Sequence, residues 1–401
     1  MKKYLTIIAS AALLAACSND VDVADSGQPT GKAIAFNMSL AGTGAQTRAA
    51  NEIKDDATLQ TIKFGVFAAY TGPLKYEQTT VSCDYMYNQP VSYENGKWSY
   101  NPVKYWPNDD RDYVSFYAYA PYTQKFATEA EGGIVDMSKN YDLGDPWINF
   151  RLPSRPWATA EGEANQIDLL YMQHLIGGSG TAADPYKYTA WDDQQNPQKV
   201  DSVMDFHFVH ALACIGDTVK VSMDEELSEY IKDYCTITLD SISIVYNNLT
   251  TKARLVLRTF DAVANWKEII SGELTTSRTF QKKFQTPVQI TKTAQNICEG
   301  TGLFYIPLQI RGTDPAVADV KLTYTIKIKD GTQWNNTTNQ YEPVQGSTYK
   351  GEAVGQFELD NNLEGQKQNI NIVLHKKFDL LHLNFGIGGT ANQPSFSRIT
   401  K

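Results

Sequence analysis

Residues 33–48 read AIAFNMSLAGTGAQTR, an alternating apolar segment followed by a loop of small residues that ends in an arginine. Every second residue of the first half is apolar: Ile34, Phe36, Met38 and Leu40. An extended backbone places such residues on one face, so the alternation predicts a half-buried β-strand. An arginine in an exposed loop is an accessible protease target. The pattern therefore predicts a first strand that cleavage between Arg48 and Ala49 would separate from the folded body.

The residues before this strand have the features of an export signal. Lys2 and Lys3 precede a short apolar run that is too short to span a bilayer as a permanent helix. The run ends in LAAC at 14–17, which resembles a bacterial lipobox, whose cysteine receives a diacylglycerol. The alternative is an ordinary signal peptide with an accidental cysteine. We expect residues 1–16 to be a lipoprotein signal peptide, Cys17 to carry lipid in the outer membrane, and residues 17–48 to be an acidic linker plus the removable strand.

Composition and charge exclude some classes of protein. The chain has 401 residues, of which 42% are hydrophobic, so it can build extensive cores. Its net charge of −9 argues against a nucleic-acid partner, because phosphate binding needs a basic face. Besides Cys17, the cysteines are Cys83, Cys214, Cys235 and Cys298. Their even number permits disulfides in an exported chain, but a chain of this size does not need them, and buried free thiols are the alternative.

Strand signals dominate the rest of the chain. The Asn95-Gly96 pair inside residues 91–100 predicts a β-hairpin, and Lys329-Asp330-Gly331-Thr332 is a further turn signal. The helix candidate is residues 224–234, where Leu227, Tyr230, Ile231 and Tyr234 share a face. Strands that recur without intervening helices favour antiparallel β-sandwiches. We expect an N-terminal β-sandwich at residues 49–200 and a C-terminal one at residues 201–401, with the boundary near residue 200.

Several segments resemble the fimbrillin family, in particular its Mfa-like and FimA-like pilus subunits. The segments WSYNPVKYWP (98–107) and YVSFYAYAPY (113–122) resemble the Mfa-like signature. The strand at 34–40 followed by Thr47-Arg48-Ala49 is similar to the start of such a protein. Weaker similarities are FVHALACI (208–215) and LEGQK (363–367), the latter with Gln368 and Asn369 where the family usually has an aromatic residue.

The resemblance implies an all-β protein with two tandem transthyretin-like, antiparallel Greek-key β-sandwich domains and little helix. It also implies a lipoprotein exported to the surface of an anaerobic Gram-negative bacterium, without enzymatic activity or a cofactor. In the family an arginine-directed protease removes the first strand. A strand of another fimbrillin subunit then occupies the open groove, which builds a surface fimbria. Other fimbrillin subunits are the expected partners, and a host protein or glycan is a candidate receptor. Stalk, tip and anchor roles all stay open.

A donor strand should again have apolar residues at every second position. The segment FDLLHLNF (378–385) meets this requirement, with Leu381, Leu383 and Phe385 on one face. It is the candidate donor strand. The alternative is that the same segment is a resident strand of the C-terminal domain.

Metal-binding sites and enzymatic active sites have weaker support in the sequence. His207, His210 and Cys214 invite a zinc site, but positions 207 and 210 point to opposite faces of a strand, so we expect no metal. Asp109-Asp110 and Asp192-Asp193 lack the spaced ligands of a calcium loop. The nucleophile, zinc-protease and phosphate-loop motifs of common enzymes are missing.

An aromatic belt supports an alternative function. Its members are Tyr85, Tyr87, Tyr93, Trp98, Tyr100, Tyr105 and Trp106. Aromatic rings stack on sugars, so a monomeric, glycan-binding surface lipoprotein is the alternative to a fimbrial subunit. The competing interpretation of the belt is sandwich core and cross-strand pairs.

The lipobox generates a direct test. Cys17→Ala should abolish labelling of the protein by a palmitate analogue and misdirect it, because the thiol is the site of lipid attachment. Labelling is measured on cells that express either form, with Cys235→Ala as the matched control that keeps the label. Equal labelling of the Cys17→Ala variant would contradict the lipoprotein assignment.

Overall fold

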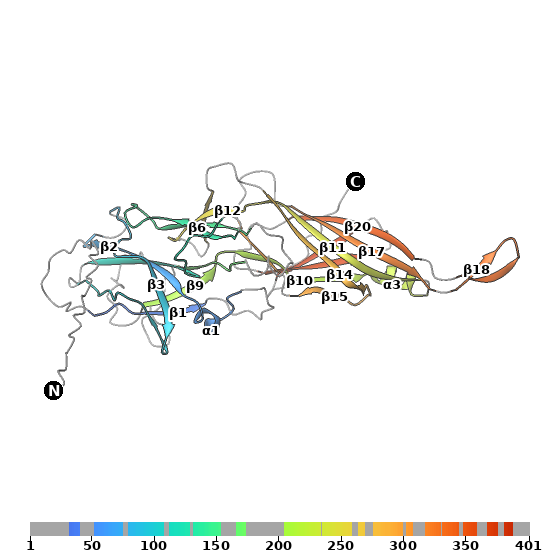
Figure 1. The fold of residues 1–401 in the computed structure, drawn as a ribbon, viewed down its shortest axis with the longest axis horizontal. Coiled ribbons are helices and arrows are strands. Elements are labelled where there is room, and N and C mark those ends of the chain that lie inside the picture. Colours follow the sequence, from blue (N-terminus) through green and yellow to red (C-terminus); the bar gives the residue numbers. More distant parts are fainter. Residues whose placement is uncertain are drawn as a thin grey trace, which may run out of the picture.

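A computed structural model describes most of the chain. The described residues are 32–40, 52–74, 79–107, 112–128, 131–153, 166–173, 204–233, 235–258, 264–268, 276–299, 302–307, 317–329, 331–344, 348–358, 367–375 and 381–387. Cys17, Arg48 and Ala49 lie outside these ranges. The molecule is elongated and built almost entirely from strands (Figure 1), which confirms the expected all-β class. In the described part of the chain, no helix has the length and apolar character needed to cross a membrane.

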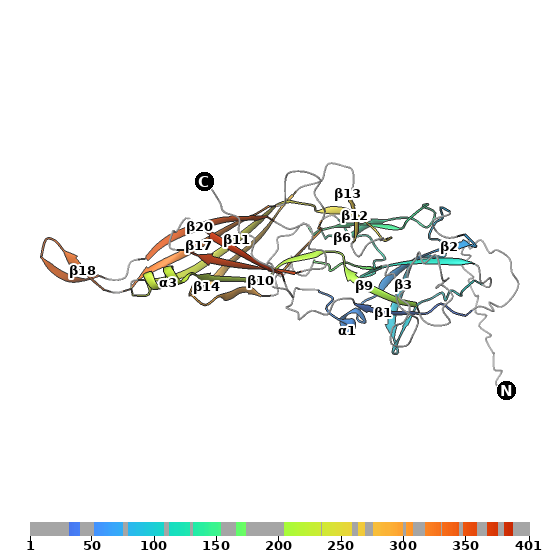
Figure 2. The same ribbon diagram turned by 180° about the vertical axis from the view of Figure 1, so that it is seen from behind.

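The half of the molecule that contains the N-terminal strands has two sheets in two layers. The larger sheet has the spatial order β1 (Phe36–Leu40), β9 (Met204–His210), β8 (Leu170–Met172), β5 (Tyr113–Ala120), β2 (Phe64–Gly72), β3 (Met86–Glu94) and β4 (Lys97–Ser99). The smaller sheet has the order β13 (Asn265–Glu268), β12 (Lys252–Val256), β7 (Trp147–Arg151) and β6 (Gly133–Met137). Figures 1 and 2 show β6 and β12 on the opposite side of this half from β3 and β9.

The other half is also formed by two main sheets. One has the order β15 (Gln295–Glu299), β10 (Ala213–Met223), β21 (Lys367–Leu374) and β22 (Leu381–Ile387), and β16 (Leu303–Tyr305) also pairs with β10. The other has the order β14 (Thr276–Gln289), β11 (Cys235–Leu249), β17 (Val317–Ile328) and β20 (Thr348–Glu358). A two-stranded ribbon, β18 (Gly331–Asn335) and β19 (Gln340–Val344), projects from the far end (Figure 2).

The chain passes between the two halves more than once. β9 follows residue 200 but belongs to the sheet of β1 and β5, and β12 and β13 pair into the sheet of β6 and β7. Residue 200 is therefore not a boundary between sheets. A division into two folding domains stays a prediction, and any such division has to assign residues 204–210, 252–256 and 265–268 to the first half.

Two strand pairs run parallel in an otherwise antiparallel structure. β1 pairs in parallel with β9, and β10 pairs in parallel with β21. Parallel neighbours need a long connection, and each of these pairs is joined by well over 100 residues of intervening chain. Both parallel pairs thus join strands that are far apart in the sequence. An alternation pattern predicts a strand but does not show which distant strand it pairs with.

Local signals of the sequence are reproduced where they are strongest. Asn95 (φ 53°) and Gly96 (φ 80°) form the predicted turn between β3 and β4. The predicted helix is α3 (Glu225–Ile231), with Asp224 as its N-cap. Tyr230 is exposed, so the predicted apolar face was wrong at this position. A second short helix, α1 (Asp56–Leu59), follows the first strand and is capped by Asp55.

The outermost strand β1 fills the centre of a core. The ring of Phe36 lies 5.0 Å from that of Phe206 and 5.3 Å from that of Tyr100, between ring centroids. Phe116 and Phe64 lie at 5.9 and 6.4 Å and meet it edge to face. Such aromatic pairs contribute about 0.5–1.5 kcal/mol each beyond area burial. One side chain of an edge strand therefore connects β2, β5 and β9.

Phe36→Ala should lower the free energy of unfolding of the uncleaved chain by about 3 kcal/mol or more, because it leaves a cavity among four rings. Asn37→Ala is the matched control on the exposed side of the same strand, and its effect should stay within about 0.5 kcal/mol. Denaturant unfolding of both variants measures the difference. Similar losses for the two variants would show that the packing of Phe36 does not stabilise the fold.

Candidate functional site

Backbone contacts hold β1 at the edge of its sheet. The strand pairs with β9 from Phe36–Met204 to Leu40–Phe208. Just before it, the backbone N–H of Ile34 donates to the carbonyl of Lys104 (2.9 Å), and that of Trp106 donates to the carbonyl of Lys32 (2.9 Å). Loss of β1 would leave the edge of β9 without its partner, and an unpaired edge is a template for another strand.

The side chains of β1, together with that of Ile34 just before it, fill four apolar sites. As predicted, Ile34, Phe36, Met38 and Leu40 are all buried. On the other face, the hydroxyl of Ser39 lies 2.7 Å from Nδ1 of His207. Burying four such side chains is worth about 1.5–3 kcal/mol each, or roughly 6–12 kcal/mol before ordering costs. The site left by β1 would have a strong preference for an apolar strand with the same period.

The chain after the expected cleavage site has attachments of its own, besides the hydrogen bond that the backbone N–H of Leu40 in β1 donates to Oδ1 of Asp56 (2.8 Å). Residues 41–51 lie outside the described ranges. Immediately after them, the Glu52 carboxylate lies 2.6 Å from Nζ of Lys367, and the backbone N–H of Ile53 donates to Oδ2 of Asp168 (2.8 Å). Ile53 itself is buried. These contacts attach the first described residues of the body to both halves of the molecule.

Sequence reasoning missed this attachment. Glu52 and Lys367 are separated by 315 residues, and Ile53 and Asp168 by 115. No motif or spacing connects positions so far apart. The sequence contains one local signal of this attachment, which is an aspartate at position 168 within the short apolar segment 167–172.

A histidine completes this charged cluster. Nδ1 of His210 lies 2.8 Å from Oδ1 of Asp168, whose side chain is almost fully buried. Burial of His210 lowers its pKa, but the charge and hydrogen bond of Asp168, with the charge of Glu52, outweigh that effect. The pKa of His210 is therefore raised above its ordinary value. The protonated imidazole thus stabilises the segment that holds Ile53.

The candidate donor segment lies in an edge strand. Leu381, Leu383 and Phe385 belong to β22, where their backbones pair with Leu374, Ile372 and Ile370 of β21. β22 is thus a resident strand, the alternative left open by the sequence, and the described strands pair with it on one side only. The end of β21 is fixed to the helix α3, because the backbone N–H of Asp224 donates to the carbonyl of Leu374 (2.9 Å). Its role as a donor stays a prediction.

Most of the aromatic belt is structural. Trp106 is buried, and Trp98 packs edge to face on both Phe64 and Tyr93, each with 5.2 Å between ring centroids. Tyr100 contacts Phe36 and donates its hydroxyl to the carbonyl of Ile34 (2.8 Å). Burial raises the pKa of Tyr100 to about 12. These four belt residues pack around β1 and its neighbours, as the core interpretation expected.

The remaining belt residues, the half-buried Tyr85 and the exposed Tyr87 and Tyr105, lie closer to the surface. Tyr85 donates its hydroxyl to the carbonyl of Tyr105, and burial raises the pKa of Tyr85 to about 12. Tyr87 packs on Phe67 with 5.7 Å between ring centroids. Tyr87 and Tyr105 are each 38% exposed. Two partly exposed tyrosines give the glycan-binding alternative less support than the whole belt suggested.

Metal and disulfide candidates find other partners. His207 contacts Ser39 and His210 contacts Asp168, as above, and the described residues contain no cluster of three side chains that could hold a metal ion. Asp109-Asp110 and Asp192-Asp193 lie outside the described ranges. The cysteines are free thiols: Cys83, Cys214 and Cys298 are buried and Cys235 is half-buried.

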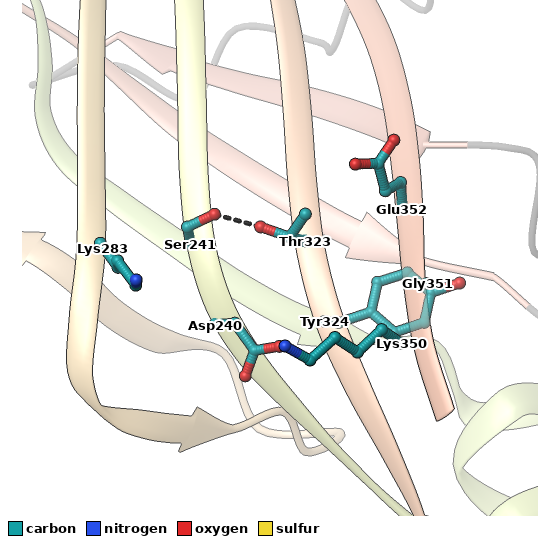
Figure 3. A pocket seen from close by; sticks show the side chains of 8 residues that line it. All are labelled: Asp240, Ser241, Lys283, Thr323, Tyr324, Lys350, Gly351 and Glu352. Atoms are coloured by element: carbon teal, nitrogen blue, oxygen red, sulfur yellow. Dashed lines mark hydrogen bonds between the residues drawn. The ribbon is translucent and has the colours of Figure 1, made fainter. Parts of the chain in front are cut away.

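A recess of about 420 Å³ lies on the outer face of the sheet that contains β11 and β17 (Figure 3). Across it, Lys283, Ser241, Thr323 and Glu352 form one cross-strand row. Three of these polar groups have neighbouring partners: Ser241 and Thr323 share a hydrogen bond, and Glu352 pairs with Lys321, which lies next to the recess, at 2.8 Å. The Tyr324 ring occupies the space over Gly351, where a Cβ atom would lie 2.6 Å from it. This arrangement is a solvated sheet face with satisfied polar groups.

The raised pKa of His210 predicts a pH dependence of stability. The stabilisation is fully present below the unfolded pKa of about 6.5 and is lost as pH rises through the higher folded value. The free energy of unfolding of the wild type should therefore fall across this range, and His210→Gln should remove that part of the slope. Identical slopes for wild type and His210→Gln would contradict the assignment.

Comparison with known proteins agrees with the resemblance seen in the sequence. Fimbrium subunit Fim1C of Phocaeicola vulgatus is 25% identical over 371 residues, which cover 87% of this chain and 89% of that protein. The crystal structure of a fimbrial protein from Bacteroides vulgatus superposes on 89% of this chain and 99% of its own, with 19% identity and a TM-score of 0.56, so the two share a fold. Residues 47–371 match the profile of the family described as Fimbrillin-like. Since this match spans most of the chain, the protein belongs to the fimbrillin-like family.

Proposed function

We propose that this chain is a structural subunit of a surface fimbria that polymerises by strand exchange after cleavage at Arg48. The observation that carries the proposal is the placement of β1. It lies at a sheet edge, buries four alternating side chains when Ile34 just before it is counted, and is followed by the segment that contains Arg48. Cleavage there would turn a strand that is covalently joined to the body into a separate peptide, which another strand can replace.

The contacts of the following residues support this order of events. Glu52 and Ile53 are bound to Lys367 and Asp168, so the body does not depend on β1 for its first attachment. A peptide that ends at Arg48 can leave while the new amino-terminal segment stays in place. The vacated site would then offer the backbone edge of β9 and the apolar pocket of Phe36 to a partner.

β22 is the proposed donor. It is an edge strand near the end of the chain, and its loss would open only one ladder, that with β21. Its first residue, Leu381, pairs with Leu374, which lies beside α3 at the end of the molecule away from β1 (Figure 1). A released β22 would therefore extend outward from that end. Its apolar residues at 381, 383 and 385 have the same spacing as those of β1.

Export as a lipoprotein completes the proposal. Lipid on Cys17 would hold the uncleaved precursor at the outer membrane, since the acyl chains contribute about 0.8 kcal/mol per buried methylene group. Cleavage after Arg48 would release the subunit from that anchor as well as open its groove. The partners are other fimbrillin subunits, and the location is the cell surface.

Arg48→Ala should yield a folded, lipidated monomer that accepts no partner, because β1 keeps its site. Wild-type protein treated with an arginine-specific protease should form oligomers that survive mild detergent on gels. Arg48→Lys is the matched variant that keeps the charge and should also stay monomeric, whereas Thr47→Ala should assemble.

Two outcomes would overturn the mechanism. One is normal assembly of Arg48→Ala. The other is cleaved protein that stays monomeric, with no change on deletion of residues 378–401. If cleaved protein assembles equally well with and without residues 378–401, β22 is not the donor strand. The proposed role of β1 would not be contradicted by that result.

A further inference from the structure

The two ends of the molecule carry exposed apolar residues. At the end that contains the ribbon, Ile328 closes β17 and Tyr349 lies at the start of β20, and both are exposed. The middle of the same sheet has a polar outer face, with Val354 as its exposed apolar residue. Apolar surface gathered at one place on a soluble protein indicates an interaction site.

The ribbon β18–β19 extends from this end. Among the described strands, β18 and β19 pair only with each other, and both views show them beyond the body (Figures 1 and 2). An isolated two-stranded hairpin is at best marginally stable in water. The register sets Trp334 opposite Tyr341, and Glu342 is the only charged residue of 331–344. Large aromatic residues are those that most often dominate protein interfaces.

The opposite end carries an aromatic patch, which we define as Tyr70, Leu74, Tyr85, Tyr105 and Leu143. The rings of Tyr70 and Tyr85 lie 5.9 Å apart, and Tyr85 donates to the carbonyl of Tyr105. Leu143 forms a backbone bridge with Ser82 and is 72% exposed. β2, which ends beside this patch, reaches the end of the molecule opposite to the ribbon (Figures 1 and 2).

The aromatic patch lies next to the site of β1. Its Tyr105 forms a backbone bridge with Ala33, just before the strand, and the neighbouring Lys104 accepts from Ile34. A strand that replaces β1 would therefore run past the patch. The ribbon and the start of β22 share the other end of the molecule. Strand exchange would thus bring the ribbon of one copy towards the patch of the next.

We propose that the ribbon β18–β19 and the adjoining Tyr349 of one subunit dock on the aromatic patch of a second copy of this chain. The proposal rests on the strand-exchange function argued above. Two different surfaces at opposite ends form a head-to-tail contact, which repeats into an open filament and not a closed dimer. One ion pair is specific to this pairing: Lys104, with Nζ 5.7 Å from the Tyr85 ring centroid, would be the partner of Glu342 on the ribbon.

Cysteine cross-linking tests the contact directly. Cys17→Ala and Cys235→Ala remove the accessible native thiols, and Gln340→Cys on the ribbon is combined with Leu143→Cys on the patch. Oxidation of the cleaved full chain should give covalent ladders. The pair Gln340→Cys with Val354→Cys, at another exposed apolar site, on β20, is the matched control. A ladder no stronger than that of the control overturns the docking proposal.

Assembly kinetics provide the second test. Trp334→Ala with Tyr341→Ala, or Tyr349→Ala alone, should slow polymerisation of cleaved protein by about tenfold. Leu143→Arg on the patch should do the same, whereas Val354→Arg should polymerise like wild type. Glu342→Lys alone should slow assembly, because it places a second positive charge opposite Lys104. The double variant Glu342→Lys with Lys104→Glu should assemble at the original rate. Unchanged rates in all patch and ribbon variants overturn the proposal.

The two proposals fail in different ways. One outcome is that the polymers resist detergent, no cross-link forms between residues 340 and 143, and the ribbon variants polymerise at the wild-type rate. This outcome would support strand exchange and contradict the docking contact. Cross-linked ladders that dissolve in detergent after reduction would keep the docking contact and remove strand exchange. Absence of both would overturn both. A folded ribbon variant is verified by an unchanged unfolding midpoint of the body.

Discussion

Phe36 packs among the rings of Phe64, Phe116 and Phe206, so the centre of one core is filled by a residue from the outermost strand. Interiors are close-packed, and a site of this size cannot stay empty without a large loss of stability. The first half of the molecule therefore requires an apolar strand beside β9, but nothing in the packing requires that strand to be covalently continuous with the body. This single constraint is the reason why the proposed mechanism can treat the strand as essential to the fold and yet replaceable by another apolar strand. Aromatic side chains of β2, β5 and β9 all converge on the site that this strand fills.

The two halves are joined by contacts in which β1 has no part. The buried amide of Gln166 donates to the carbonyl of Gly302 (2.9 Å) and accepts from the backbone N–H of Phe304 (2.8 Å). Glu52 and Lys367 form a second such contact, and the indole of Trp266 donates to the carbonyl of Ala211 (2.9 Å). Removal of one partner from a buried polar pair leaves the other unsatisfied, so such contacts resist separation. Together with the repeated passage of the chain between the halves, they would hold the architecture together during the proposed exchange of an edge strand.

Polar and apolar surface are distributed in a way that fits assembly along the long axis. On the outer face of the sheet with β11 and β17, charged and hydroxyl side chains bind their cross-strand neighbours, as Asp319 does with Asn247 (2.6 Å) and Gln356 (2.7 Å). Such a face is already satisfied and gains little from a partner. The exposed tyrosines and leucines lie mainly towards the ends, where a neighbour could cover them. The aromatic belt shows the same division, since its inner members pack around β1 and its outer members reach the end surface.

The sequence by itself determined the elements whose signals are local. Alternation at 34–40 specified β1 and its buried face, Asn95-Gly96 specified a turn because both positions need positive φ, and Asp224 specified the start of α3. The strand β14 was not predicted, because its lysines and glutamines on a solvated face hide the alternation. Only the tertiary structure decided that β9 and β12 belong to the first half, that β22 is an edge strand, and that Glu52 meets Lys367. The physical reason is that local patterns encode burial and backbone conformation, whereas the partner of a strand or a charge is selected by chain closure over hundreds of residues.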